Sequence, residues 1–286
     1  MAVDYGTLKR GGFMRQKQKN CFSLRIKVVG GQLTAQQLAK VAEVAKEYGQ
    51  DYVHLTSRQG IEIPFIKLEQ VEEVKKALAD GNVFPGTCGP RVRTVTACQG
   101  SKVCPNGCID TEGLAEEISD RYFGRELPHK FKFGVTGCQN NCLKAEENDL
   151  GIKGGLKVDW VEDKCIRCGL CVKACRQNAI VLDEEGIHID REKCNFCGRC
   201  AFSCPTNAYD TTEGYIVSFG GLFGNHINKG KPIIPFIEDH DKLIKVCDAT
   251  IAFFEENAKP SERFKFTIDR IGLDKLEEKV LEAYNS

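Results

Sequence analysis

The sequence predicts an α+β fold, and three observations support this prediction. The first 84 residues alternate between strand and helix patterns in the order strand, helix, strand, strand, helix. Two runs with the same cysteine spacing follow between residues 165 and 204. Strand and helix patterns then resume over residues 214–284.

The first unit is predicted from apolar periodicity. Residues 22–29 have the pattern of a strand, and Thr34 is placed to cap a helix over 35–48. Strands follow near 52–56 and 61–66, and a helix near 69–79. This order suits a ferredoxin-like half-domain, which we assign to residues 1–84.

Composition narrows the class of protein. Forty basic residues balance forty acidic ones, so no overall field favours binding to nucleic acid. No apolar run approaches the roughly 18 residues of a membrane span, and the first residues lack the apolar stretch of a secretory signal. We therefore expect a cytoplasmic protein. In that compartment, sixteen cysteines in 286 residues indicate metal binding rather than disulfides.

The two cysteine runs, "CIRCGLCVKAC" and "CNFCGRCAFSCP", both have the spacing C-x2-C-x2-C-x3-C. Bacterial two-cluster ferredoxins use this spacing, and the fourth cysteine of each run binds the other cluster. One predicted [4Fe–4S] cluster is therefore held by Cys165, Cys168, Cys171 and Cys204, and the other by Cys194, Cys197, Cys200 and Cys175. A pair of zinc sites is the alternative, but zinc sites typically group cysteines in twos.

Two further cysteine pairs precede these runs. Cys98 and Cys104 form C-x5-C, and Cys138 and Cys142 form C-x3-C. Either pair alone has the character of buried thiols. Together they make a plausible third cubane site with ligands from two separated loops.

These residues resemble the siroheme and [4Fe–4S] sulfite and nitrite reductases. In that family, the cysteines of C-x5-C and C-x3-C hold a [4Fe–4S] cubane. The last of these four cysteines also bridges to the siroheme iron, and the resemblance implies this role for Cys142. The stretches "LRIKVVGG", "HLTSRQ", "RTVTAC", "LPHKFKFGVTGC" and "YIVSFGGLFG" are similar to further motifs of the family. The small catalytic polypeptide of anaerobic sulfite reductases and short dissimilatory-type homologues resemble this chain in having a ferredoxin insertion.

The resemblance implies a division of the rest of the chain. Residues 85–159 and 211–286 would form a siroheme- and [4Fe–4S]-binding α/β domain, and residues 160–210 an inserted two-cluster ferredoxin domain. Helices are expected near 112–122, 240–257 and 273–284, and a strand near 214–222. Larger members contain two copies of the unit, with cations from one and cysteines from the other. A single copy here predicts a homodimer or higher oligomer, with sites near the interface between protomers.

The resemblance also implies roles for the cationic residues. Arg25, Arg93, Lys130 and Lys132 would surround an oxyanion substrate, and Arg58, Lys27 and His54 would hold siroheme carboxylates. Lys130 and Lys132 are two residues apart, so on a strand both project from one face. The alternative is that they are only the solvated face of a strand whose Phe131 lies in the core.

The predicted function is six-electron reduction of sulfite to sulfide, with siroheme and three [4Fe–4S] clusters as cofactors. Nitrite reduction to ammonia and a non-catalytic electron carrier or siroheme-handling protein are the alternatives. The chain has no G-x-G-x-x-G fingerprint, so electrons are expected from a ferredoxin or a flavin-containing partner protein. Of the remaining cysteines, Cys108 in "CPNGC" is an alternative cubane ligand, while Cys21, Cys88 and Cys247 are expected to be buried thiols.

Overall fold

The structure is a computed structural model that describes residues 3–286. Its first part is a four-stranded antiparallel sheet with the order β1-β2-β4-β3. The strands are β1 (Phe13–Arg15), β2 (Cys21–Arg25), β3 (His54–Leu55) and β4 (Ile61–Lys67). Three helices accompany the sheet: α1 (Tyr5–Arg10), α2 (Ala35–Tyr48) and α3 (Val71–Ala79).

The five expected elements of this part are present in the expected order, but the sequence analysis missed α1 and β1, and the first expected strand is shorter. Thr34 caps α2 as predicted, because its hydroxyl accepts from Gln37 N at 3.1 Å while the Gln37 side chain accepts from Thr34 N at 2.9 Å. The strand expected over 22–29 ends at Arg25. Beyond Arg25, Ile26 forms an isolated bridge with Pro85. The chain then turns at Gly30 and Gly31, whose φ angles are 60° and 75°.

The central part is a five-stranded sheet with the order β11-β10-β7-β6-β5. Its strands are β5 (Thr96–Ala97), β6 (Phe133–Thr136), β7 (Leu150–Trp160), β10 (Tyr209–Phe219) and β11 (Lys231–Pro232). β5, β6 and β7 run parallel to one another, and β10 is antiparallel to β7. The parallel strands therefore present their amino ends at one edge of the sheet and their carboxyl ends at the other.

Four helices bury the apolar surface of this sheet: α4 (Thr111–Tyr122), α7 (His240–Asn257), α8 (Phe264–Ile271) and α9 (Leu273–Asn285). Phe131, Phe254 and Phe264 are fully buried and have mutual ring-centroid distances of 5.2 to 5.6 Å. The sequence predicted α4, α7 and α9, but it missed the short helix α8. None of the helices described over residues 3–286 is long and apolar enough to cross a bilayer.

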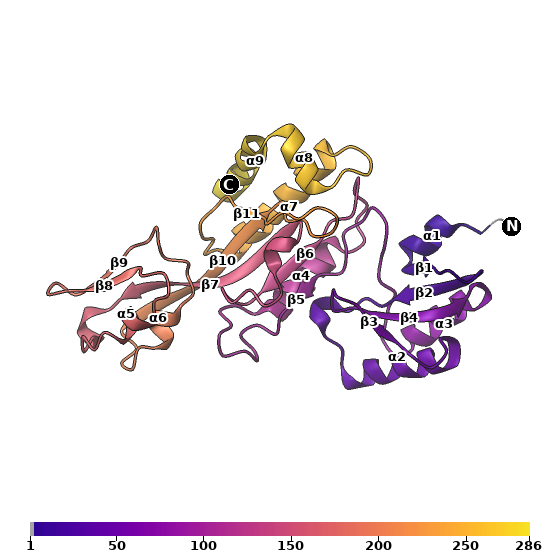
Figure 1. Ribbon diagram of the computed structural model, residues 1–286, viewed down its shortest axis with the longest axis horizontal. Coiled ribbons are helices and arrows are strands. Elements are labelled where there is room, and N and C mark those ends of the chain that lie inside the picture. The colour runs from indigo at the N-terminus through magenta and orange to yellow at the C-terminus, as the bar shows by residue number, and fades with distance from the viewer. Residues whose placement is uncertain (1–2) are drawn as a thin grey trace.

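A long two-stranded ribbon carries the cysteine runs away from the central sheet. β7 and β10 pair along their whole length: Leu150 faces Phe219 at one end, and Trp160 faces Tyr209 at the other. Residues 161–208 lie between the far ends of these strands and contain α5 (Leu170–Ala174), α6 (Arg199–Phe202) and the hairpin β8–β9 (Ile180–Leu182 and Ile187–Ile189). Figure 1 shows this segment at one end of an elongated molecule, with the four-stranded sheet at the other end.

Candidate functional site

A cavity of about 510 Å³ lies between the four-stranded sheet and the amino ends of β5 and β6. Six of the predicted site residues line it: Arg25, His54, Arg58, Arg93, Lys130 and Lys132. Arg93 precedes β5, and the two lysines precede β6, so the parallel pairing of these strands brings them to the same edge of the sheet. Glu62 is the one carboxylate among the lining residues. The cavity is therefore suited to anions.

The two lysines lie as their spacing predicts. Phe131 between them is fully buried and pairs with Val92, so both lysines face away from the core and into the cavity. Burial, together with the nearby Arg58, lowers the pKa of Lys132 to about 8, although Asp149 partly opposes this shift. Burial and the nearby Arg263 also lower the pKa of Lys130. An ammonium with a pKa of about 8 is well placed to donate protons near neutral pH.

Arg58 joins the two parts of the molecule at the floor of the cavity. Its guanidinium donates to Asn148 Oδ1 at 2.6 Å, to Thr94 O at 3.3 Å and to Phe133 O at 3.4 Å. Its burial lowers its pKa to about 10. Next to it, Gln59 pairs with both backbone groups of Ala97 in β5 at 2.8 and 3.0 Å. These bonds fix the β3–β4 loop onto the edge strand of the central sheet.

The other predicted cations differ in the contacts that they make with the rest of the protein. Arg93 donates to Thr87 O and Gly89 O, both at 3.1 Å, while its buried Nε has no partner among the described residues. Arg25 donates to Glu62 at 2.6 Å and to Cys88 Sγ at 3.2 Å. Lys27 does not line the cavity, because its ammonium lies over the ring of Phe123 at 4.6 Å. The structure thus brings together all the predicted cations except Lys27.

A buried ion pair behind the lysines was missed by the sequence analysis. Asp149 is fully buried, accepts from Arg263 at 2.9 and 3.1 Å, and accepts from the backbone N–H of Lys132 at 3.0 Å. It holds the chain at the start of β6, where Lys132 enters the cavity. Arg263 and Asp149 are 114 residues apart in sequence, and no local pattern links the two.

The C-x5-C and C-x3-C cysteines gather at the opposite edge of the sheet. Cys98 follows β5 and Cys138 follows β6, so the parallel pairing sets them side by side. Cys98 Sγ accepts from the backbone N–H of Gly137 at 3.1 Å. Cys98, Cys104 and Cys142 are all close enough to Cys138 to contribute, after burial, to the raised pKa of its thiol. The four cysteines therefore form one group.

The cysteines of the two runs form two separate groups. One cavity is lined by Cys165, Cys168, Cys171 and Cys204. A second is lined by Cys175, Cys194, Cys197 and Cys200. In both, the fourth cysteine of a run joins the first three of the other run. No three His, Cys, Asp or Glu side chains in residues 3–286 are close enough to hold a single metal ion.

The two runs are folded as repeats of one backbone design. Gly169 and Gly198 have φ angles of 71° and 68°, and each precedes a short helix. In each run the last cysteine accepts from the backbone N–H four residues later: Ala179 to Cys175 at 3.3 Å and Ala208 to Cys204 at 3.2 Å. N–H groups directed at sulfur stabilise thiolates, which is the form that binds iron. The donor set therefore fits iron–sulfur ligation.

The cysteine group after β5 and β6 faces away from the cation cavity. Cys142 is exposed and does not line the cavity. The four residues of β6 separate Lys132 from the cysteine loop by about 13 Å at the usual strand rise. Within one chain, the cations and Cys142 therefore lie at opposite ends of the same strands.

Cys108 is buried between two of the cysteine groups. Burial, with Cys138 and Cys197 nearby, raises the pKa of its thiol to about 12. A cavity of about 170 Å³ at the same junction is lined by residues around Cys138 and by residues around Cys197. The group at the sheet edge thus adjoins the group that contains Cys197.

Two family models and several relatives match this chain. The family model "Nitrite and sulphite reductase 4Fe-4S domain" matches residues 88–286, and the model "Nitrite/Sulfite reductase ferredoxin-like half domain" matches residues 14–81. The chain is 33% identical over 282 residues to a coenzyme F420-dependent sulfite reductase of Methanocaldococcus jannaschii. This match covers 97% of the chain and 45% of that protein.

A second relative is one of the polypeptides of the anaerobic sulfite reductase of Salmonella typhimurium. The two sequences are 31% identical over 197 residues, which cover 63% of this chain and 58% of that polypeptide. The chain thus spans about half of the length of the two named relatives.

A solved structure supports the fold. The crystal structure of dissimilatory sulfite reductase I matches with a TM-score of 0.74 at 22% identity, over 91% of this chain and 69% of that one. The predicted α+β class and the ferredoxin-like half are confirmed.

Proposed function

The chain belongs to the nitrite and sulphite reductase family, and from this premise we propose that it reduces sulfite to sulfide at a siroheme. The observation that carries the proposal is the cavity in which five Lys and Arg side chains and His54 meet a single carboxylate. Reduction of bisulfite to hydrosulfide consumes six electrons and six protons and releases three waters. The site must therefore bind an oxyanion and deliver protons repeatedly.

The residues of the cavity divide these tasks by their chemistry. Arg25 and Arg93 keep their charge at all relevant pH values and offer planar forks to oxygen atoms, so they would hold the substrate. Lys130 and Lys132 have lowered pKa values and would supply protons as sulfur–oxygen bonds break. Arg58 donates three hydrogen bonds to the protein, so it would position the floor of the site and present positive charge there.

The site fits the cofactors that the family implies. The buried, unpaired Nε of Arg93 suits an oxyanion, the positive charge of Arg58 at the floor of the cavity suits the carboxylates of siroheme, and the three cysteine groups with their N–H donors suit three [4Fe–4S] clusters. When bound, siroheme would supply the iron at which sulfur is reduced, and the clusters would supply electrons. His54 would contact the cofactor rim. Lys27 keeps no such role in this proposal, because it lies on Phe123.

The positions of the cations and Cys142 favour a site shared between two copies of the chain. Both half-sites have exposed apolar side chains beside them: Leu55 follows His54 and is 73% exposed, and Val103 precedes Cys104 and is 64% exposed. A homodimer with a two-fold axis would set the cavity of each copy against the Cys142 loop of its partner. Two complete sites would result.

The proposed route for electrons follows the three cysteine groups. The group at the sheet edge adjoins the group with Cys197. The other group includes Cys171 of α5, which Figure 1 shows farther from the central sheet than α6. Electrons from a ferredoxin or a flavin-containing partner protein would enter at the outer group and pass inward to Cys142. Cys108 is buried along this route, between the two groups.

The function can be tested on protein purified without oxygen. We expect a haem-type absorption spectrum that shifts on addition of sulfite, and sulfide production when reduced methyl viologen is the electron source. Ammonium formed from nitrite without sulfide from sulfite would identify a nitrite reductase instead. A spectrum with cluster absorption alone and no product from either anion would identify an electron carrier.

We expect the rate to fall as pH rises through about 8. The pKa of Lys132 is about 8 because burial disfavours its charged form, so the proton that it donates is lost above that pH. Lys132→Arg keeps the charge but removes the proton donor, so we expect the alkaline limb of kcat/KM to disappear and the rate to fall by about 10² to 10⁴. Lys275→Arg on α9 is the control and should keep the limb. An unchanged limb in Lys132→Arg would assign the proton to another group.

A further inference from the structure

The two cysteine repeats have equivalent backbones but different surroundings. Twenty-nine residues separate equivalent positions, so Ile166, Arg167 and Leu170 of the first repeat correspond to Asn195, Phe196 and Arg199 of the second. Arg167 and Phe196 both have positive φ, at 55° and 58°. The two repeats therefore present equivalent surfaces, and these surfaces have different neighbours.

The surface of the second repeat is covered by the rest of the chain. The backbone oxygen of Phe196 accepts a hydrogen bond from Leu156 N at 2.8 Å, and its ring stacks on Phe236 at 4.4 Å. Arg199 donates to Asn140 at 3.4 Å. Asn140 lies in the loop between Cys138 and Cys142, so the covering element is the one that holds the next cysteine group. In this repeat, the surface is the contact between successive redox sites.

The equivalent surface of the first repeat is open. Ile166 is 64% exposed and Leu170 is 42% exposed, and both line the cavity that contains the outer cysteine group. Cys168 is itself exposed. Phe202 on α6 and Val181 on β8 are exposed as well. Two exposed apolar side chains, Ile166 and Leu170, thus lie beside an accessible cysteine group, in the segment that Figure 1 shows at one end of the molecule.

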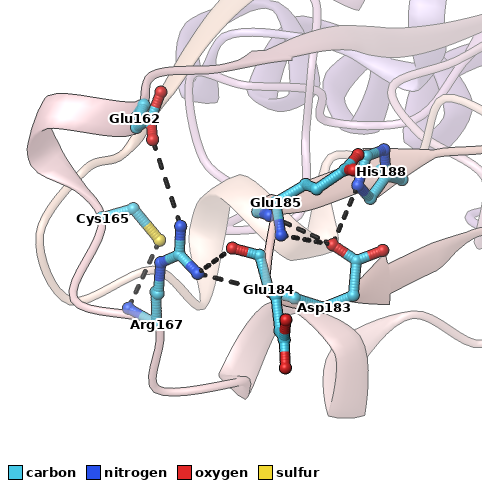
Figure 2. A network of polar contacts seen from close by, with 8 residues as sticks. Glu162, Cys165, Arg167, Asp183, Glu184, Glu185 and His188 are labelled. Atoms are coloured by element: carbon cyan, nitrogen blue, oxygen red, sulfur yellow. Dashed lines mark hydrogen bonds and ion pairs between the residues drawn. The ribbon is translucent and has the colours of Figure 1, made fainter.

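Acidic groups form one side of this surface. Arg167 donates to the backbone oxygen of Glu184 at 2.8 Å and lies 4.0 Å from Glu162, while its backbone N–H donates to Cys165 Sγ at 3.4 Å. Figure 2 shows that Arg167 connects the β8–β9 turn, with its successive acidic residues 183–185, to the cysteine group. Glu184 and Glu185 are exposed and have no cationic side-chain partner within 4.0 Å among the described residues. Their charges are available to a basic partner.

We propose that an electron-donor protein docks on Ile166 and Leu170, with a rim of lysine or arginine that meets the β8–β9 turn. The proposal rests on the proposed function, in which electrons enter at the outer cysteine group. The partner would cover this repeat as the Asn140 loop covers the other, and one electron would pass from its redox group to the cluster without proton transfer. An apolar centre with a charged rim is typical of such an interface.

The test uses oxidised cytochrome c, a basic redox protein, as the probe. The chain is reduced with dithionite and desalted, and electron transfer to cytochrome c is followed by stopped flow at low ionic strength. Glu184→Lys with Glu185→Lys should slow the reaction about tenfold, and added salt should slow the wild-type reaction. Glu72→Lys with Glu73→Lys on α3 makes the same charge change elsewhere and should leave the rate nearly unchanged. Equal effects of the two double variants, or no effect of either, would overturn the proposal.

A second experiment tests the apolar side chains of the docking surface, and it does not depend on catalytic turnover. Calorimetric titration of the oxidised proteins should show weaker binding of cytochrome c by Ile166→Ser, by about three- to tenfold, and no change for Leu38→Ser on α2. If Ile166→Ser instead converts a dimer into a monomer in sedimentation, the surface binds a second copy and the proposal is wrong. Sulfide production with reduced methyl viologen is measured separately, so loss of the proposed function is recognised independently.

Discussion

Coexpression of a Cys142→Ser chain with a Lys132→Met chain is expected to restore activity that neither chain has alone. In a dimer with shared sites, a heterodimer contains one site with the intact cavity of the first chain and the intact thiol of the second. Random pairing makes half of the dimers mixed, and one of their two sites is intact, so about one quarter of the wild-type activity should return. The physical reason is the strand β6, which keeps Lys132 and Cys142 of one chain apart.

The control for this experiment pairs two defects in the same half-site. A Lys130→Met chain coexpressed with a Lys132→Met chain contains no intact cavity, so no dimer can form an intact site. Both mixtures are assayed for sulfide with reduced methyl viologen, and for haem-type absorption. No recovery in the first mixture, when mixed dimers are verified by tags, would place the whole site within one chain. Recovery in the control would show that Lys130 and Lys132 do not act in the same cavity.

Removal of cysteines in pairs is expected to reveal which ones share a cluster. Cys175 lines the same cavity as Cys194, although Cys175 ends the run that starts with Cys165. Cys175→Ala with Cys194→Ala should therefore lose about four iron atoms per chain, as either single variant does. Cys175→Ala with Cys165→Ala should lose about eight, because two clusters are affected.

Iron content per chain, measured after anaerobic reconstitution, decides between the two pairings. If each run held its own cluster, the pair Cys175 and Cys165 would lose no more iron than a single variant. Cys247→Ala is the control, because this thiol is fully buried in α7 and belongs to none of the three groups. It should keep the wild-type iron content.

Local sequence patterns predicted much of the site. The spacing of the cysteines predicted three groups, because most ligands of one cluster come from short stretches of chain. The alternation of Lys130, Phe131 and Lys132 predicted two cations on one face of an extended segment, because successive side chains of a strand alternate. Thr34 predicted the start of α2, because a side-chain cap acts over three residues.

Other features depended on contacts between distant segments. Lys27 was expected at the cofactor, but Phe123 lies close enough to hold its ammonium. Asp149 and Arg263 are 2.9 Å apart in space and more than a hundred residues apart in sequence, so no periodicity could link them. Arg58 lines the cavity, and its hydrogen bonds to Asn148, Thr94 and Phe133 join it to residues far away in the sequence.

The sequence by itself determined the chemistry of this protein, and the tertiary structure decided its placement. Cysteine spacing and residue type predict which clusters and anions the chain binds, because ligand chemistry is local. The parallel pairing of β5 with β6 decided that the cations lie at one edge of the sheet and Cys142 at the other. Strand pairing is a long-range contact, and it separates groups that are close along the chain. This separation is why we propose a site completed by a second copy.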